Sequence, residues 1–211
     1  MPSDALDRLA RARDTGVAGH NPSMPDAPAP HPAIASTATW LDAAVIGLDL
    51  CPFASGVRAR QAVRFALSAA TAWPALRSDL ADELARLIAA DPAEIETTLV
   101  VCPDVPVGFD EFNQFLDEAD DTLVALDLEG VIQIASFHPD YRFAGTEAHD
   151  ITNATNRSPH PTLHLLRESS VERAVASFGD TDAICDANLK TLRELGNAGW
   201  MSLRATWLHS P

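Results

Sequence analysis

The sequence predicts an α/β fold: a single domain with a small three- to four-stranded sheet packed with helices, after a flexible N-terminal tail. Strand-like and helix-like patterns alternate from residue 62 to residue 195, which is typical of α/β proteins. The segment "NPSMPDAPAPHPAI" (21–34) is rich in Pro and Ala and has no periodicity, as expected of a tail or linker. A chain of 211 residues is long enough for one domain and a tail. We expect the tail over residues 1–34 and the domain over 35–205.

The folded unit is expected to begin near Thr37, and "STATWLDAAVIGLDL" predicts a helix with Ser36 or Thr37 as its N-cap. This helix must end by Cys51, because Pro52 disfavours the helical conformation at the residue before it. The alternation in "AVRFALSAA" then predicts a strand over 62–70. Leucines near helical spacing predict a helix over 74–90, and the β-branched run "TTLVVCP" predicts a buried strand over 97–103.

The second half of the domain is predicted in the same way. An apolar stripe with acids opposite indicates a helix within 108–130, and "VIQIASF" indicates a strand over 131–137. A polar stretch follows to about Ser158. We expect a helix over 159–178 and a last helix over 181–195, which Gly196 ends.

Charge and composition narrow the classes of function. The chain has 15 basic and 30 acidic residues, for a formal charge of −15, and this field repels phosphate backbones. No apolar run reaches the ~18 residues of a membrane span, and the first residues lack the apolar core of a secretory signal. We therefore expect no nucleic-acid partner and no membrane association. Three widely spaced cysteines fit a reducing compartment, and we expect a cytoplasmic protein.

The polar stretch that follows the strand over 131–137 holds most of the candidate chemistry. Four of the seven histidines lie between residues 134 and 168: His138, His149, His160 and His164. Ligands of α/β sheets gather outside the carboxyl ends of strands, and His138 and Tyr141 follow such an end. Long ordered loops are uncommon unless they serve a function. We expect a site here.

A divalent metal is one hypothesis for this stretch. His138, His149 or Asp150, and His164 supply suitable ligands and would leave one position open, although their spacing is not diagnostic. In "HPTLH" the two histidines have helical spacing. Pro161 stands where a zinc-binding H-E-x-x-H helix carries its glutamate, so a shared metal is not the favoured interpretation of His160 and His164.

Anion recognition is a second hypothesis. Arg157 precedes the helix expected at Pro159, whose free N–H groups and dipole would favour an anion. Arg142 and Arg167 would add bidentate contacts to a carboxylate or phosphate. The alternative is that these arginines pair with neighbouring acids, which are Asp140, Asp150 and Glu168.

Cys51 is a candidate nucleophile outside the polar stretch. It lies at a bend between a helix and Pro52, where a thiol can be partly exposed. A nearby His138 or His164 would make a thiolate accessible. The alternative is a small buried hydrophobic residue.

Several blocks of the sequence closely resemble domain-of-unknown-function family 1415, a group of bacterial and plastid-type proteins. They are "WLDAAVIGLDLCPFA", "FNQFLDEADDTLVALDLEGVIQIASFHPDYRFAGT", "DITNATNRSPHPTLHLLRE" and "NLKTLRELG", within residues 38–200. The resemblance implies no established activity. It draws attention to the positions Cys51, His138, Tyr141, Asn153, Asn156, Arg157, His164 and Arg167. The chain departs from the family pattern with His160 in place of a frequent tyrosine and Asp49 in place of a frequent asparagine.

The leading functional hypothesis from the sequence is a small enzyme that acts on an anionic small metabolite. His138 and His164 would act as acid/base groups or metal ligands, Cys51 and Tyr141 would assist, and arginines and asparagines would hold the ligand. A non-catalytic ligand-binding or regulatory module is the alternative. In a third interpretation the polar stretch is structural, and its side chains bond the loop backbone. The sequence leaves the substrate, the metal and the oligomeric state open.

Overall fold

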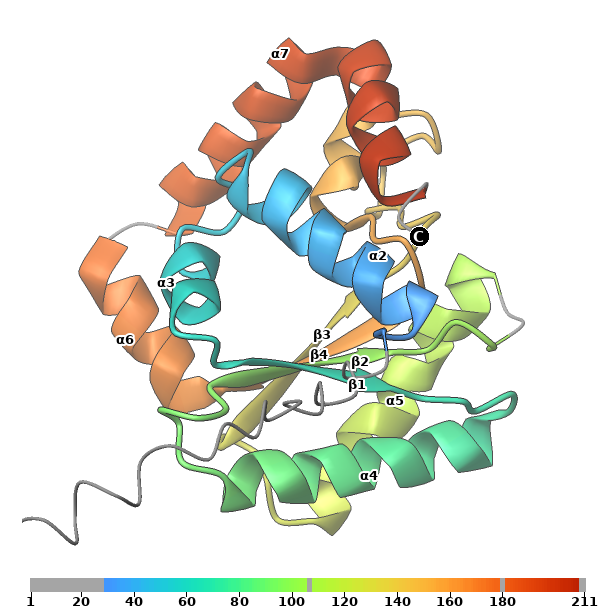
Figure 1. The fold of residues 1–211 in the computed structure, drawn as a ribbon, viewed down its shortest axis with the longest axis vertical. Helices are drawn as coiled ribbons and strands as arrows, with labels where there is room; N and C mark the ends of the chain where they lie inside the picture. Colours follow the sequence, from blue (N-terminus) through green and yellow to red (C-terminus); the bar gives the residue numbers. More distant parts are fainter. Residues whose placement is uncertain (1–28, 106–107, 179–180, 209–211) are drawn as a thin grey trace, which may run out of the picture.

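The computed structural model describes residues 29–105, 108–178 and 181–208, and its centre is a four-stranded mixed sheet (Figure 1). The strands are β1 (Val63–Leu67), β2 (Thr97–Val101), β3 (Ile132–Phe137) and β4 (Thr162–Arg167), in the order β1-β2-β4-β3. β1 and β2 are parallel, whereas β4 is antiparallel to both of its neighbours. β1, β2 and β3 therefore share one direction, with β4 between β2 and β3. The predicted α/β fold with a small sheet is confirmed.

Helices cover both faces of this sheet. On one face lie α4 (Trp73–Ala89) and α5 (Phe109–Ala125). On the other lies α2 (Pro32–Trp40), which continues as the π-helical segment η1 (Leu41–Ile46), with α7 (Thr181–Leu208) packed against it (Figure 1). The short α3 (Ala54–Ala59) and α6 (Glu168–Phe178) lie close together on the same side as α2.

The larger hydrophobic core lies under α4 and α5. Leucines spaced along α4 face inward because residues three or four apart share one side of a helix. They are buried against Phe112 and Phe115 of α5 and against Leu163 and Leu165 of β4. Burying each of these large side chains contributes about 1.5–3 kcal/mol. The α4 leucines in this core are Leu76, Leu80, Leu84 and Leu87, and the predicted helices over 74–90 and 108–130 are confirmed.

The predicted helix over 159–178 is wrong in its first half, because the structure places the strand β4 there. β4 pairs on both sides and is covered on both faces, so its sequence "TLHLLR" lacks the polar alternation of a half-exposed strand. A short apolar run of this kind resembles a buried helix segment in periodicity. Helix begins only at Glu168. The predicted anion site of Arg157 at a helix start therefore has no helix behind it.

Three other boundaries differ from the prediction. α2 begins at Pro32, ahead of the expected start at Thr37, and His31 caps it by accepting a hydrogen bond from the Ala33 N–H at 3.2 Å. Residues 32–34 thus belong to the fold, and the rest of the predicted tail lies mostly outside the described residues. Gly196 interrupts α7 with a φ of 64°, as expected, but helix resumes beyond it to Leu208. α3 was not predicted. None of the described helices is both long and apolar enough to cross a membrane.

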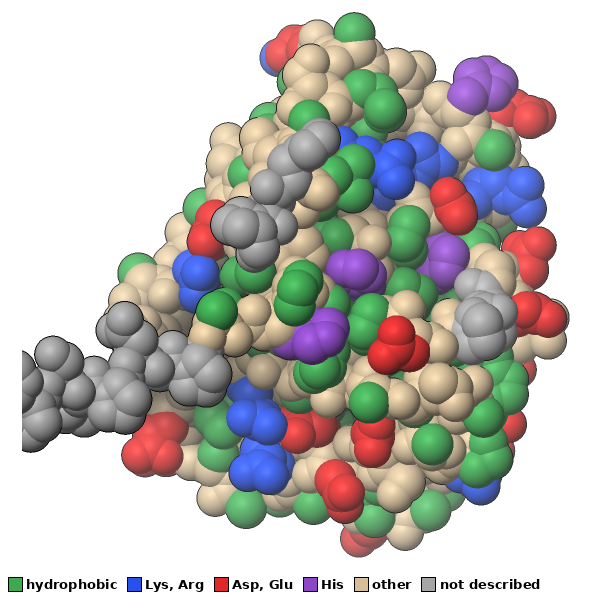
Figure 2. Space-filling view, turned by 45° about the vertical axis from the view of Figure 1, so that its right-hand side comes forward, with side chains coloured by type: hydrophobic (Ala, Val, Ile, Leu, Met, Phe, Trp, Pro, Cys, Tyr) green, Lys and Arg blue, Asp and Glu red, His purple; other side chains and the backbone are tan. Residues whose placement is uncertain are grey.

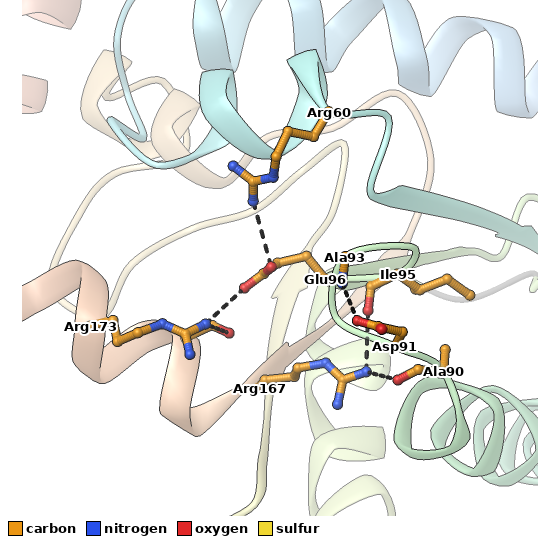
Figure 3. Close-up of polar contacts among 9 residues, drawn as sticks. Arg60, Ala90, Asp91, Ala93, Ile95, Glu96, Arg167 and Arg173 are labelled. Carbon is orange, nitrogen blue, oxygen red and sulfur yellow. Dashed lines mark hydrogen bonds and ion pairs between the residues drawn. The ribbon is translucent and has the colours of Figure 1, made fainter.

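Arg167 at the end of β4 fastens the sheet to the C-terminal end of α4. Its Nη2 donates hydrogen bonds to the carbonyls of Leu87, Ala90 (2.9 Å) and Ile95 (3.2 Å), two of which are drawn in Figure 3. The last carbonyls of a helix lack partners within the helix, and a cationic side chain there also meets the negative end of the helix dipole. The arginine predicted to clamp an anion is therefore engaged with backbone carbonyls.

We expect Arg167→Met to lower the free energy of unfolding by about 2–3 kcal/mol, because it leaves these carbonyls without their charged donor. Urea denaturation monitored by circular dichroism measures the change. The matched control is Arg77→Met, which removes an exposed arginine from α4 and should cost less than about 0.5 kcal/mol. Equal costs for the two variants would contradict the assigned role of Arg167.

Candidate functional site

A cavity of about 410 Å³ lies on the α2 side of the sheet and is lined by residues of all four strands and of α2, η1, α3 and α6. Its walls are mostly apolar. They include Trp40, Val45, Phe53, Leu99, Phe137 and Val171. The lining begins at the amino ends of β1 and β2 and extends across the sheet to the carboxyl end of β3. The cavity thus covers a face of the sheet, whereas the sequence predicted a site at the strand ends.

His164 lies in the floor of this cavity. In the sheet it stands opposite Leu99 of β2 and Ala135 of β3, and all three residues line the cavity. Its Nε2 is 2.8 Å from the hydroxyl of Thr97. That hydroxyl donates its proton to the carbonyl of Leu165 at 2.6 Å, so it can only accept from the imidazole. The proton of the neutral ring is therefore on Nε2.

This arrangement leaves Nδ1 of His164 as a hydrogen-bond acceptor. Among the described residues no hydrogen-bond partner of Nδ1 is present, and the side chain lines the cavity. Burial lowers the pKa of His164 from 6.5 to about 4, because a charged ring would lose hydration. At neutral pH the cavity therefore contains an uncharged imidazole with one unpaired acceptor.

Cys51 lines the same cavity from the segment between η1 and α3. Its thiol interacts with the backbone N–H groups of Phe53 and Ala54, which favour a thiolate. Burial has the larger effect and raises the pKa of Cys51 above its ordinary value. The resting thiol is therefore protonated, although it shares a cavity with His164.

His138 lies on the opposite side of the sheet from His164. It is buried, and its ring contacts Phe109 and Phe112 of α5, with ring centroids 5.8 and 5.6 Å away. Its Nδ1 accepts a hydrogen bond from the N–H of Asp140 at 3.0 Å. The sheet therefore separates the two histidines that the sequence analysis assigned to one site.

The predicted metal set is not assembled either. His149 is exposed, and within the described parts of the chain no group of three His, Cys, Asp or Glu side chains is placed to hold an ion. His160, which the sequence analysis set apart, is half-buried with its Nε2 3.1 Å from the hydroxyl of Ser36. Burial lowers the pKa of His160.

The polar loop after β3 is bonded largely to itself. Asn153 is fully buried, and its Oδ1 accepts hydrogen bonds from the Phe143 N–H (3.0 Å) and the Thr146 hydroxyl (2.8 Å). Arg157 donates to the carbonyls of Tyr141 (3.2 Å) and Ala148 (2.6 Å). These contacts fit the structural interpretation of the loop.

Asn156 is the residue of this loop that reaches the cavity. Its Nδ2 donates to the carbonyl of Ser136 at 3.3 Å, and its side chain also hydrogen-bonds Tyr141. Burial raises the pKa of Tyr141. Arg142 is exposed, 3.8 Å from Asp110, beside a separate open depression of about 340 Å³. Of the predicted site residues, the cavity thus brings together Cys51, Asn156, His164 and Arg167.

Sequence reasoning missed Thr97 and the apolar walls. Thr97 looks like an ordinary first residue of a strand, and only its pairing with β4 places its hydroxyl against His164. Trp40 and Phe53 likewise look like ordinary core residues in the sequence. A sequence pattern shows which side of an element is apolar, but it does not show that a space remains beside that side.

We expect the partly buried, neutral His164 to make stability depend on pH. The unfolded chain takes up a proton near pH 6.5, whereas the folded chain does so only near pH 4, so the unfolding free energy falls as pH falls through this window. The slope is at most about 1.4 kcal/mol per pH unit. Denaturation of wild type and His164→Gln at several pH values checks this. The unfolding free energy of wild type should fall relative to that of His164→Gln toward pH 4, and parallel curves would contradict the prediction.

A comparison with protein-family models matches residues 32–202 to the family described as protein of unknown function DUF1415. Comparisons with curated proteins and with solved structures found no match. The family match contains every residue that lines the cavity. It agrees with the resemblance seen in the sequence blocks, and the chain belongs to the DUF1415 family.

Proposed function

We propose that this protein binds a small, largely apolar molecule in the cavity and orients it by a hydrogen bond to His164. The observation that carries the proposal is an imidazole acceptor that has no partner among the described residues and belongs to a side chain in the floor of an apolar cavity. Ligand sites are typically mostly apolar cavities of ~300–1,000 Å³ with a few placed polar groups. The cavity of about 410 Å³ fits this description.

The apolar walls and the imidazole of His164 contribute differently to binding. Apolar contacts with walls such as Trp40 and Leu99 supply affinity, at roughly 25 cal/mol for each Å² removed from water. The imidazole supplies orientation. A ligand that carries a hydroxyl or N–H can pair with Nδ1, whereas a ligand without a donor would cover the acceptor and leave it unpaired, which costs about 1–3 kcal/mol.

The inner end of the ligand is therefore expected to be uncharged. His164 is neutral, the thiol of Cys51 is protonated, and Thr97 is engaged with Leu165. Arg157 and Arg167, the predicted anion clamp, donate to backbone carbonyls. The geometry thus favours the ligand-binding hypothesis over an enzyme that clamps an anion in this floor.

We expect naphthol to bind about fivefold more tightly than methoxynaphthalene, because only naphthol donates a hydrogen bond to Nδ1. Isothermal titration calorimetry measures both affinities. In His164→Phe the preference should disappear, while methoxynaphthalene still binds. An unchanged preference in this variant would show that His164 does not orient the ligand.

A cavity-filling variant gives the control for location. Ala135 lies opposite His164 in the sheet and lines the cavity, so Ala135→Phe should abolish binding of both probes. Ala75→Phe adds the same ring at an exposed position of α4 and should leave binding unchanged. Binding that survives Ala135→Phe would place the ligand elsewhere.

A catalytic function at the same cavity is the second candidate, because Cys51 and His164 both line it. Here Nδ1 of His164 would accept the thiol proton, and the Cys51 thiolate would add to the carbonyl carbon of an ester or thioester ligand. Its C–O or C–S bond would then break, and the imidazolium would return the proton to the leaving alkoxide or thiolate. This hypothesis retains the predicted nucleophile and base, but without His138.

A reactive Cys51 predicts fast alkylation by iodoacetamide that depends on His164. In a Cys185→Ser background, which removes the exposed thiol, His164→Gln should slow the reaction at Cys51 at least tenfold. Mass spectrometry of the modified peptide gives the rate. A rate unaffected by His164→Gln rules out the imidazole as base and leaves the binding function alone.

A further inference from the structure

Glu96 joins the lining of the cavity to two arginines from neighbouring helices. It precedes β2, and its carboxylate lies 3.5 Å from Nη2 of Arg60, which follows α3, and 3.3 Å from Nη2 of Arg173 on α6. Figure 3 shows the two guanidinium groups approaching this carboxylate from different helices. Ser170, which also lines the cavity, accepts a hydrogen bond from Arg173 at 2.9 Å. We call Arg60, Glu96 and Arg173 the rim triad.

The rim triad has an excess of positive charge. Two guanidinium groups face one carboxylate, and the arginine side chains are 56% and 67% exposed, whereas that of Glu96 is only 14% exposed. Each guanidinium has several N–H donors, of which the carboxylate occupies only a part. The chain as a whole carries a charge of −15, and acidic side chains are scattered over the face drawn in Figure 2. The rim is thus a local cationic position beside an apolar cavity.

From this juxtaposition we infer that the ligand is an amphipathic anion: its apolar body fills the cavity and its carboxylate pairs with Arg60 and Arg173 at the rim. The inference rests on the proposed binding function and adds the class of ligand. Planar guanidinium groups suit a carboxylate, which they can bind through paired N–H donors. In the absence of a ligand, Glu96 pairs with both arginines. When a ligand binds, Glu96 competes with the ligand's carboxylate for them.

Removing the arginines of the rim triad and removing the charge of its glutamate should have opposite effects on the affinity for an anionic ligand. Decanoate and decanol have the same chain length but differ in charge, and both are titrated below the concentration at which they aggregate. They are compared in a His164→Phe background, because the decanol hydroxyl could otherwise pair with Nδ1 in the floor. In this background the protein should prefer decanoate about fivefold, as expected for two partly exposed ion pairs. Arg60→Gln combined with Arg173→Gln should abolish the preference, and Glu96→Gln should increase it. Decanol affinity should stay the same in all these variants.

The control for overall charge is Arg77→Gln combined with Arg86→Gln on α4. These arginines are 55% and 57% exposed, and each lies 3.5 Å from a glutamate, so the variant removes the same charge from a similar setting outside the cavity lining. It should retain the decanoate preference.

The outcomes separate the rim from the cavity. If decanol and decanoate bind equally in the His164→Phe background, or if the control abolishes the preference as the rim variant does, the rim has no role in selection and the inference is overturned, while the binding function stands. If neither probe binds and naphthol does not bind either, the cavity itself is not a ligand site, and the inference is overturned with the proposed function.

Discussion

The position of β4 between β2 and β3 is the constraint on which the rest of the structure depends. Side chains alternate across a strand, so one short segment serves both faces of the sheet. Leu163 and Leu165 complete the core under α4 and α5, and His164 and Leu166 form part of the cavity floor on the other face. Arg167 then ties the end of the strand to α4. A shift by one residue would exchange the two sets and place an imidazole in the core.

The same alternation explains why the histidines do not form one site. His138 ends on the α5 side among aromatic rings, and His164 ends on the α2 side. What remains at the cavity is one partly buried, neutral imidazole whose tautomer is fixed by Thr97, close to a largely apolar lining. Such a group orients a ligand through a hydrogen bond. Charged side chains lie at the rim, where Glu96 meets Arg60 and Arg173, whereas Arg167 of the lining donates to backbone carbonyls.

The sequence predicted most elements from local patterns. The stripes of α4 and α5 and the strands β1 and β3 follow from periodicity, and β2, which is buried along its whole length, follows from its β-branched run. The interruption at Gly196 follows from residue type. β4 was missed because both of its faces are covered, which removes the polar alternation of a half-exposed strand, and because its sequence "TLHLLR" lacks the β-branched run that marks β2. In the candidate site, His164 and Cys51 were singled out by residue type. Their shared cavity depends on pairing between distant strands, which periodicity does not contain.

The imidazole ¹⁵N spectrum of His164 at neutral pH tests the central claim most directly. We predict a neutral ring with the proton on Nε2 and an unprotonated Nδ1, whose resonance shifts when naphthol binds. A proton on Nδ1, or a charged ring at neutral pH, would contradict it, because the cavity would then present a donor in place of the acceptor on which the proposed binding depends.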